Sequence, residues 1–319
     1  MAMVETVRGP VDTDALGTTL MHEHVFVRSE EVQLNYPAGW DEDERVDDAI
    51  GKLNALAKRG CQTIADPTVI GLGRDIGRII RVADGTSLNI IVATGLYTYN
   101  DVPFYFRYRG PRGDGLDPMA QLFIDDLTTG IAGTHVKAAF LKCAIDEPGM
   151  TPGVERVLRA VCQAHAETGA PVTVHTHPHS FTGRAVLDVL RAEKTDLSKV
   201  VLGHSGDSTD LDYLSELADA GCLLGMDRFG LDVITPFEDR VGTVAAMCER
   251  GYADRMVLSH DAACHIDWFP AEVIPRFAPA WNFGHLFNDV LPALRERGVT
   301  ESQIQTMLVD NPRRYFSGN

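Results

Sequence analysis

The chain has no long apolar run and no signal-peptide pattern. No stretch of its 319 residues approaches the roughly 18 consecutive apolar residues of a membrane-spanning helix. Glu5, Asp12 and Asp14 interrupt the N-terminal segment, where a secretory signal would carry an apolar core. These absences predict a cytoplasmic protein without a membrane-spanning helix.

Basic residues are scarce relative to acidic ones. Lys and Arg number 29 against 45 Asp and Glu, so the formal charge is −16 at pH 7. A surface of this sign repels nucleic-acid phosphates and anionic lipid headgroups. We therefore expect neither a nucleic acid nor a membrane as a partner.

The sequence also lacks any C-x-x-C pair. Its cysteines are scattered, mostly in apolar surroundings, at Cys61, Cys143, Cys162, Cys222, Cys248 and Cys264. Isolated cysteines of this kind are typical of free thiols in reducing compartments. The pattern argues against both a disulfide framework and a zinc knuckle.

No low-complexity tract, long linker or change of composition divides the chain. Hydrophobic residues make up 45% of it, which is enough for a sizeable core. We therefore expect residues 1–319 to form a single domain.

Apolar runs rich in Val, Ile and Leu alternate with segments of helical periodicity. The expected strands are Thr18–His24, Cys61–Asp66, Asn89–Gly95, Ala139–Cys143, Val172–Thr176, Val200–His204, Leu223–Asp227 and Met256–Ser259. The expected helices are Glu44–Arg59, Pro118–Ile131, Pro152–Thr168, Gly183–Glu193, Asp210–Ala220 and Phe237–Arg250. Strands that alternate with helices favour a parallel sheet.

Eight such units predict an α/β fold, a closed (β/α)8 TIM barrel. A doubly wound nucleotide-binding sheet would carry a glycine fingerprint after its first strand. Here His22-Glu23-His24 occupies that place. In a barrel the chemistry takes place at the C-terminal ends of the strands, so these ends are examined for reactive side chains.

Several strand ends carry side chains that can bind metals. His22 and His24 are two residues apart and share one face of a continuous strand, roughly 6–7 Å apart along it. The full set of candidate ligands is His22, His24, Lys142, His175, His204 and Asp261. Imidazole and carboxylate groups bind Zn, Co, Mn or Fe. The sequence therefore predicts a metal centre at this rim.

Lys142 stands out because it lies in an otherwise apolar strand end. Burial there favours the neutral amine. A neutral amine could act as a nucleophile, or it could be carboxylated by carbon dioxide and bridge two metals. Paired metals lower the pKa of a bridging water and polarise the bond that is attacked.

Each of these residues also has a plain structural explanation. A single His-x-His is weak evidence, Lys142 could form an ion pair with Asp146 or Glu147, and Asp261 could cap a helix or form a turn. The complete set at one rim favours the metal centre. We expect His177 and His179 to lie further out, and His260 to be structural.

The whole chain resembles the phosphotriesterase family of the amidohydrolase superfamily, and within it the phosphotriesterase-like lactonases. The matching segments occur in order: Thr19 to His24, Thr94 to Tyr97, Leu141-Lys142 followed by Asp146 to Gly149, Val174 to His177, Gly203 to Asp207, Gly225 to Gly230, Ser259 to Asp261 and Asp310 to Arg314.

The resemblance implies a binuclear centre. It assigns His22, His24 and Asp261 to one metal and His175 and His204 to the other, with Lys142 as a bridging N6-carboxylysine. It also implies that Asp261 shuttles the proton, that Tyr97 and Arg228 line the site, and that Trp268 begins the substrate loop. Where members of the family often carry a cysteine, this chain has Ala263, followed by Cys264 and His265. Ala263 and His265 therefore join the expected substrate-binding residues.

The resemblance also implies a small-molecule lactone as the substrate, with N-acyl-homoserine lactones favoured, together with promiscuous hydrolysis of paraoxon-type phosphotriesters. An apolar segment after strand eight could hold the acyl chain: Trp268, Phe269, Ile274, Phe277, Trp281, Phe283, Leu286 and Phe287. The aromatic-rich segment from Tyr97 to Tyr108, together with the habit of the family, predicts a homodimer.

Three other functions compete with the lactonase. Within the family, the chain could be a primary phosphotriesterase or another esterase or amidase. Lys142 could instead form a Schiff base in a metal-free lyase or aldolase. A catalytically silent binding protein on the same barrel would be expected to have lost some of the six ligands, all of which are present.

Overall fold

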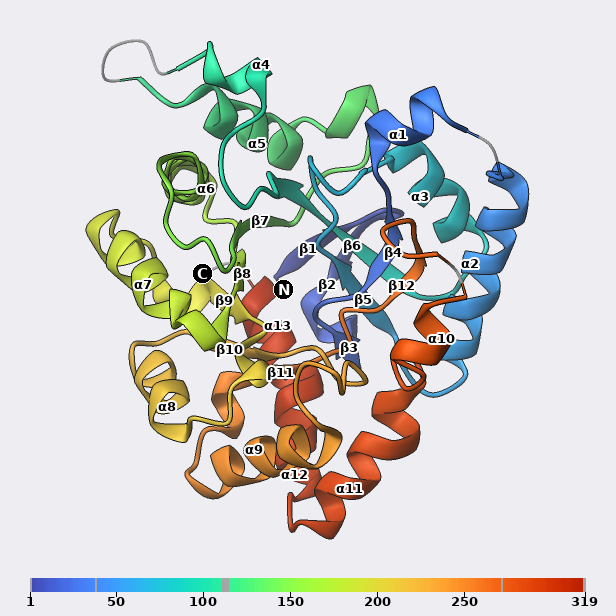
Figure 1. The fold of residues 1–319 in the computed structure, drawn as a ribbon, viewed down its shortest axis with the longest axis vertical. Helices are drawn as coiled ribbons and strands as arrows, with labels where there is room; N and C mark the ends of the chain where they lie inside the picture. Colours follow the sequence, from blue (N-terminus) through green and yellow to red (C-terminus); the bar gives the residue numbers. More distant parts are fainter. Residues whose placement is uncertain (1, 38, 111–114, 271, 318–319) are drawn as a thin grey trace.

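The computed structural model describes residues 2–37, 39–110, 115–270 and 272–317. Its centre is an eight-stranded sheet in which all strand pairs are parallel, surrounded by helices (Figure 1). The strands, in spatial order, are β11 (Met256–Leu258), β10 (Leu223–Met226), β9 (Val200–Gly203), β8 (Val172–Thr176), β7 (Phe140–Ile145), β6 (Asn89–Gly95), β5 (Thr63–Asp66) and β3 (Thr19–Leu20).

The two ends of this sheet meet. The Met21 amide donates to the Leu258 carbonyl at 3.5 Å, and the Asp261 amide donates to the His22 carbonyl at 3.0 Å. The expected (β/α)8 TIM barrel is therefore confirmed.

The first expected strand is interrupted, which corrects the prediction of one strand over Thr18–His24. β3 ends at Leu20, and β4 (His24–Val27) pairs with β12 (Ala263–Ile266) in a separate two-stranded sheet. The buried Glu23 carboxylate causes the break, since it accepts hydrogen bonds from the Ser259 hydroxyl and the amides of His260 and Ala262. The chain turns to satisfy this carboxylate, and the turn brings His22 and His24 to the rim.

The helices cover the outside of the barrel. They are α1 (Glu30–Asn35), α2 (Glu42–Ala57), α3 (Ile76–Asp84), α4 (Phe104–Arg107), α5 (Pro118–Thr128), α6 (Pro152–Thr168), α7 (Thr182–Ala192), α8 (Leu211–Asp219), α9 (Phe237–Glu249), α10 (Ile274–Phe277), α11 (Leu291–Glu296), α12 (Glu301–Gln305) and α13 (Asn311–Phe316). A hairpin of β1 (Met3–Thr6) and β2 (Gly9–Asp12) precedes the barrel. Each described helix is too short or too polar to cross a membrane.

Local sequence accounts for where the helices begin and end. The Thr151 hydroxyl accepts from the Val154 amide and Pro152 occupies the first turn of α6, while Gly169 follows its last turn with a φ of 70°. Asp41 caps α2 in the same way, through the amides of Asp43 and Glu44. These caps satisfy amides and carbonyls that a helix leaves free at its ends.

Two apolar clusters form the core. The larger lies between the strands and the helices, and the smaller fills the barrel interior and its N-terminal end. Tyr315 and Phe316 of α13 belong to the smaller cluster, and the Tyr315 hydroxyl lies 2.9 Å from that of Thr173 in β8. The interior is therefore closed at that end, and a ligand reaches it only from the C-terminal rim.

Candidate metal centre

All the predicted ligands meet at the C-terminal rim. His22, His24, Lys142, His175 and Asp261 line one cavity of about 260 Å³, and His204 lies directly behind His175. The side chains of these histidines and of Lys142 are almost fully buried. Buried polar groups in such number require hydrogen-bonding or ionic partners.

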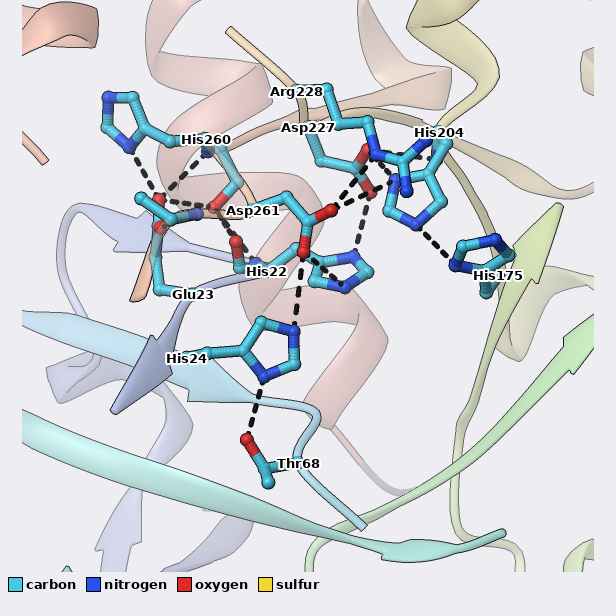
Figure 2. Close-up of polar contacts among 12 residues, drawn as sticks. His22, Glu23, His24, Thr68, His175, His204, Asp227, Arg228, His260 and Asp261 are labelled. Atoms are coloured by element: carbon cyan, nitrogen blue, oxygen red, sulfur yellow. Dashed lines mark hydrogen bonds and ion pairs between the residues drawn. The ribbon is translucent and has the colours of Figure 1, made fainter. Parts of the chain in front are cut away.

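His22 and His24 are held from behind by hydrogen bonds at Nδ1. The Asp227 carboxylate lies 2.9 Å from Nδ1 of His22, and the Thr68 hydroxyl lies 2.7 Å from Nδ1 of His24 (Figure 2). The Nε2 atoms of the two rings lie 3.4 Å and 3.3 Å from Oδ1 of Asp261. Both rings thus present Nε2 to the same carboxylate.

The second histidine pair is oriented in the same manner. Oδ1 of Asp227 lies 2.9 Å from Nδ1 of His204, and Nε2 of His204 lies 2.8 Å from Nδ1 of His175. Nε2 of His175 contacts the Asp146 carboxylate. Burial lowers the pKa of His175 to about 4, and the Asp146 contact offsets this only in part. His175 is therefore neutral near pH 7, which is the form that binds a metal.

Lys142 completes the group from β7. Its Nζ lies 3.2 Å from Nε2 of His22, and burial lowers its pKa to about 8 although Asp261 favours the charged form. Among the described residues, Asp146 pairs with His175, and neither Asp146 nor Glu147 forms an ion pair with Lys142. The alternative of a structural ion pair for Lys142 therefore finds no support.

Backbone geometry brings these side chains close together. Gly95 of β6 has a φ of 148°, and a Cβ there would lie 1.8 Å from the Lys142 carbonyl oxygen. His204 and Asp261 have φ values of 63° and 56°, in the left-handed region that residues with a side chain seldom adopt. Strained backbone of this kind concentrates at functional sites.

The donor set fits divalent cations. The coordinating atoms of His22, His204 and Asp261 all lie within 4.8 Å of one another. Imidazole nitrogens whose other nitrogen is hydrogen-bonded to a carboxylate or hydroxyl are typical of metal ligands, because the second contact fixes the ring. The cluster is therefore compatible with the metal dependence expected from the sequence.

Arg228 lies between two carboxylates at the edge of the cluster. It donates through Nε to Asp261 and through a terminal nitrogen to Asp207, each at 3.0 Å. Burial lowers the pKa of Arg228, but these two carboxylates outweigh it and raise the pKa overall. Burial raises the pKa of Asp261, but His22, His204, His24 and Arg228 together hold it well below its usual range. Both groups therefore stay charged.

The remaining predicted residues fall in two places. Tyr97, Arg228, Ala263 and Trp268 line the same cavity as the ligands, and the Tyr97 hydroxyl lies 3.3 Å from Nδ1 of His175. His265 lines a neighbouring cleft, which Ala263 also borders. The structure thus places His265 behind the cavity wall.

The other histidines expected to lie outside the centre do so. His260 is fully buried, contacts Glu23 through Nδ1 and accepts from the Leu286 amide through Nε2. His177 contacts Ser180 in the loop after β8. These contacts support a structural role for His260, and the one hydrogen-bonding partner found for the His177 side chain among the described residues is Ser180 of its own loop.

Sequence reasoning gave no role to Asp227 or Thr68. Asp227 follows β10 directly and holds one histidine of each predicted metal set. Its place at a strand end was a usable signal, since a carboxylate there must face the rim. Thr68 offered no comparable signal, because it lies in the loop after β5, and its contact with His24 follows from the pairing of β5 with β3.

Comparisons with known proteins agree with this geometry. Residues 2–316 match the Phosphotriesterase family. The chain is 60% identical to the phosphotriesterase homology protein of Mycobacterium tuberculosis strain H37Rv, over 99% of this chain and 98% of that protein. It is 40% identical to the aryldialkylphosphatase of Saccharolobus solfataricus, over 96% and 97%.

A solved structure agrees as well. The structure titled as the phosphotriesterase from Mycobacterium tuberculosis superposes with a TM-score of 0.97 at 59% identity, and the match covers 99% of this chain and 98% of that one. Fold, ligand cluster and sequence comparison thus lead to one conclusion. The chain belongs to the phosphotriesterase family and is a hydrolase of its metal-dependent type.

Proposed function

We propose that the protein opens lactone rings, with N-acyl-homoserine lactones as the favoured substrates and paraoxon-type phosphotriesters as secondary ones. The observation that carries this proposal is the contrast within one cavity. One end holds the ligand cluster, and the rest is apolar: Val27, Leu72, Leu231, Val233, Ile234, Ile266, Phe269, Val273, Ile274, Phe277 and Trp281. A polar ring at the cluster and an acyl chain along this wall would match it.

In the proposed centre, His22, His24 and Asp261 would hold one divalent ion, His175 and His204 would hold the other, and N6-carboxylated Lys142 would be a ligand common to both. Zn, Co, Mn or Fe would suit these donors. When bound, such a pair supplies an activated water and a Lewis acid. The pKa of about 8 for Lys142 supports carboxylation, because only the neutral amine reacts with carbon dioxide.

Three side chains of the cavity carry the proposed proton and charge steps. Asp261 accepts the proton of the attacking water and passes it to the leaving alkoxide. Burial raises the pKa of Tyr97 well above its usual value, so its hydroxyl stays protonated and can donate to the carbonyl oxygen. Arg228 fixes Asp261 through the 3.0 Å contact at Oδ2.

Phosphotriester hydrolysis as the primary activity is the second candidate. Two observations favour it: one relative carries the name aryldialkylphosphatase, and the matching solved structure is titled as a phosphotriesterase. A lactone carbonyl and a phosphoryl oxygen are similar acceptors, so the same cluster could serve both. Relative kcat/KM values decide between them.

We further propose a cytoplasmic homodimer in which residues 1–319 act as one domain. Exposed aromatic side chains around α4 support the dimer, with Phe104 72% and Tyr108 78% exposed. Phe106 of the same segment is buried and belongs to the core instead. All six cysteines are buried free thiols, as in reducing compartments. A monomeric mass in light scattering at micromolar protein would refute the dimer.

The decisive experiment combines metal content with activity. Protein purified without added metal is analysed for metals per chain and assayed for homoserine-lactone opening before and after chelation. The proposal predicts about two ions per chain, with activity lost on chelation and restored by Zn, Co or Mn. Metal without lactonase activity would favour phosphotriester, ester or amide substrates. A chain that binds no metal, but is trapped by borohydride with a carbonyl substrate, would restore the Lys142 Schiff base.

A further inference from the structure

A second cleft, of about 570 Å³, borders the catalytic cavity. One wall is α2, and the other is formed by β12 and the segments that follow it, which Figure 1 shows beside α2. Ala263, Ile266, Phe269, Ile274 and Trp281 line both spaces. The two are therefore separated by a single layer of side chains.

The α2 wall is cationic. Arg45 and Lys52 are seven residues apart on one side of α2, Arg59 lies in the turn directly after the helix, and all three line the cleft. Lys52 is occupied, because its Nζ contacts Asp48 and the Cys264 carbonyl at 2.7 Å each. Within the described part of the chain, the Arg59 side chain donates only to the Ala55 carbonyl, and the buried Nε of Arg45 has no partner. The guanidinium groups of Arg45 and Arg59 therefore form no ion pair with a described carboxylate.

The opposite wall does not neutralise this charge. Among the described lining residues the one carboxylate is Asp267, which already accepts from the Ser29 amide and hydroxyl and from Gln33. His265 also lines the cleft, and burial followed by the charge of Arg45 lowers its pKa to about 4. A cleft with a net positive lining is unusual for a chain whose formal charge is −16. The uncharged part of its lining includes four aromatic side chains, Trp40, Phe269, Trp281 and Phe283, beside the amides of Gln33 and Asn282.

We propose that this cleft binds an amphipathic carboxylate, with the anion held by Arg45 and the apolar body against Trp40, Trp281 and Phe283. Guanidinium groups bind carboxylates through paired hydrogen bonds, and the aromatic lining accepts an alkyl chain. The link to catalysis rests on the proposed function, because opening a lactone converts a neutral molecule into a carboxylate of this class. A single layer of side chains then separates the cleft from the cavity in which that product forms.

Binding of decanoate to the metal-loaded protein, without any lactone, tests the proposal. Tryptophan fluorescence, to which Trp40 and Trp281 of the cleft contribute, reports binding, and titration calorimetry gives the Kd. We expect saturable binding that weakens with added salt, and much weaker binding of the uncharged 1-decanol. Arg45→Gln should raise the Kd for decanoate about tenfold, the loss expected for one charged hydrogen-bonding partner. Arg250→Gln should leave it unchanged, since Arg250 is an exposed arginine that pairs with Asp212 elsewhere.

Several results would overturn the proposal. One is absence of saturable decanoate binding at millimolar concentration, and another is equal affinity for decanol. An Arg45→Gln variant with unchanged Kd would place the carboxylate at the metal centre instead. Thermal unfolding and paraoxon hydrolysis of Arg45→Gln check that the variant is folded. If it is not, a raised Kd of Arg45→Lys, which keeps the charge but loses the paired hydrogen bonds of the guanidinium, carries the test. Decanoate binding without lactonase activity would refute the lactone substrate but not the cleft.

Discussion

The ligand cluster and the loops around it are built differently. In the cluster, His22, His24 and His204 are each buried and held at Nδ1 by a second side chain. In the segment around α10, Phe277 is 52% exposed although it lines the same cavity. The difference teaches that residues at the strand ends determine the reaction. Substrate range depends instead on loop side chains whose positions the barrel strands do not fix.

The physical basis of this contrast is the strand ladder. Lys142 pairs in register with Gly95 of β6 and with Thr173 of β8, so its position follows from the sheet. α10 has four residues, no buried residue and no side-chain cap. Substitutions in the cluster should therefore affect every substrate, and substitutions in the loop should affect some substrates only.

The largest effect is expected for Asp261→Asn. The amide keeps the shape of the side chain but can neither accept the proton nor carry the charge that faces His22 and His24. We expect kcat/KM to fall by about 10²–10⁴ for lactone and paraoxon alike. Steady-state kinetics on metal-loaded protein measure this. Near wild-type turnover would refute the proton-shuttle role.

A smaller loss is expected for Asp227→Asn, which leaves every proposed ligand in place. The carboxylate holds His22 and His204 at 2.9 Å each, so its replacement loosens one histidine of each metal set. Metal affinity should fall about 10–100-fold. Competition with a chelator measures it, and Asp254→Asn at the exposed end of another loop serves as the control. Unchanged affinity with reduced activity would show that Asp227 acts on the reaction and not on the ligands.

Metal loading should depend on pH through Lys142. Its lowered pKa of about 8 makes the amine neutral above that pH and charged below it. Between pH 6.5 and 8 the neutral fraction rises about 15-fold, and reactivation of metal-free protein by zinc at fixed dissolved carbon dioxide should accelerate by a similar factor. A rate independent of pH in this range would contradict carboxylation as the slow step.

The smallest effect is expected at the loop. Phe277→Ala removes part of the apolar wall, at a cost of about 1 kcal/mol for a long acyl chain. We expect kcat/KM to fall about fivefold for long-chain lactones and to stay unchanged for short-chain lactones and paraoxon. Tyr36→Ala, at an exposed aromatic outside both the cavity and the proposed dimer surface, is the matched control. A uniform fall in kcat/KM across all substrates would instead show that α10 affects the ligand cluster.

The sequence predicted the bounds of helices and strands most accurately where the local residue pattern alone specifies the element. Val172–Thr176 and Pro152–Thr168 were predicted with the bounds that the structure shows, since continuous β-branched runs and a capped amphipathic pattern depend on neighbours in sequence. It failed at residues 21–23, where β3 and β4 are separate. The cause is Glu23, whose partners lie more than 230 residues away in the chain.

The sequence by itself determined the alternation of strands and helices, the barrel and the identity of the residues at its rim, because periodicity and spacing are local properties. The tertiary structure decided how those residues face one another. Strand pairing and barrel closure bring Asp227 against His204 and His22, assign Asp146 to His175 rather than to Lys142, and place His265 in the cationic cleft beside α2. These contacts join residues far apart in sequence, and no local pattern specifies their geometry.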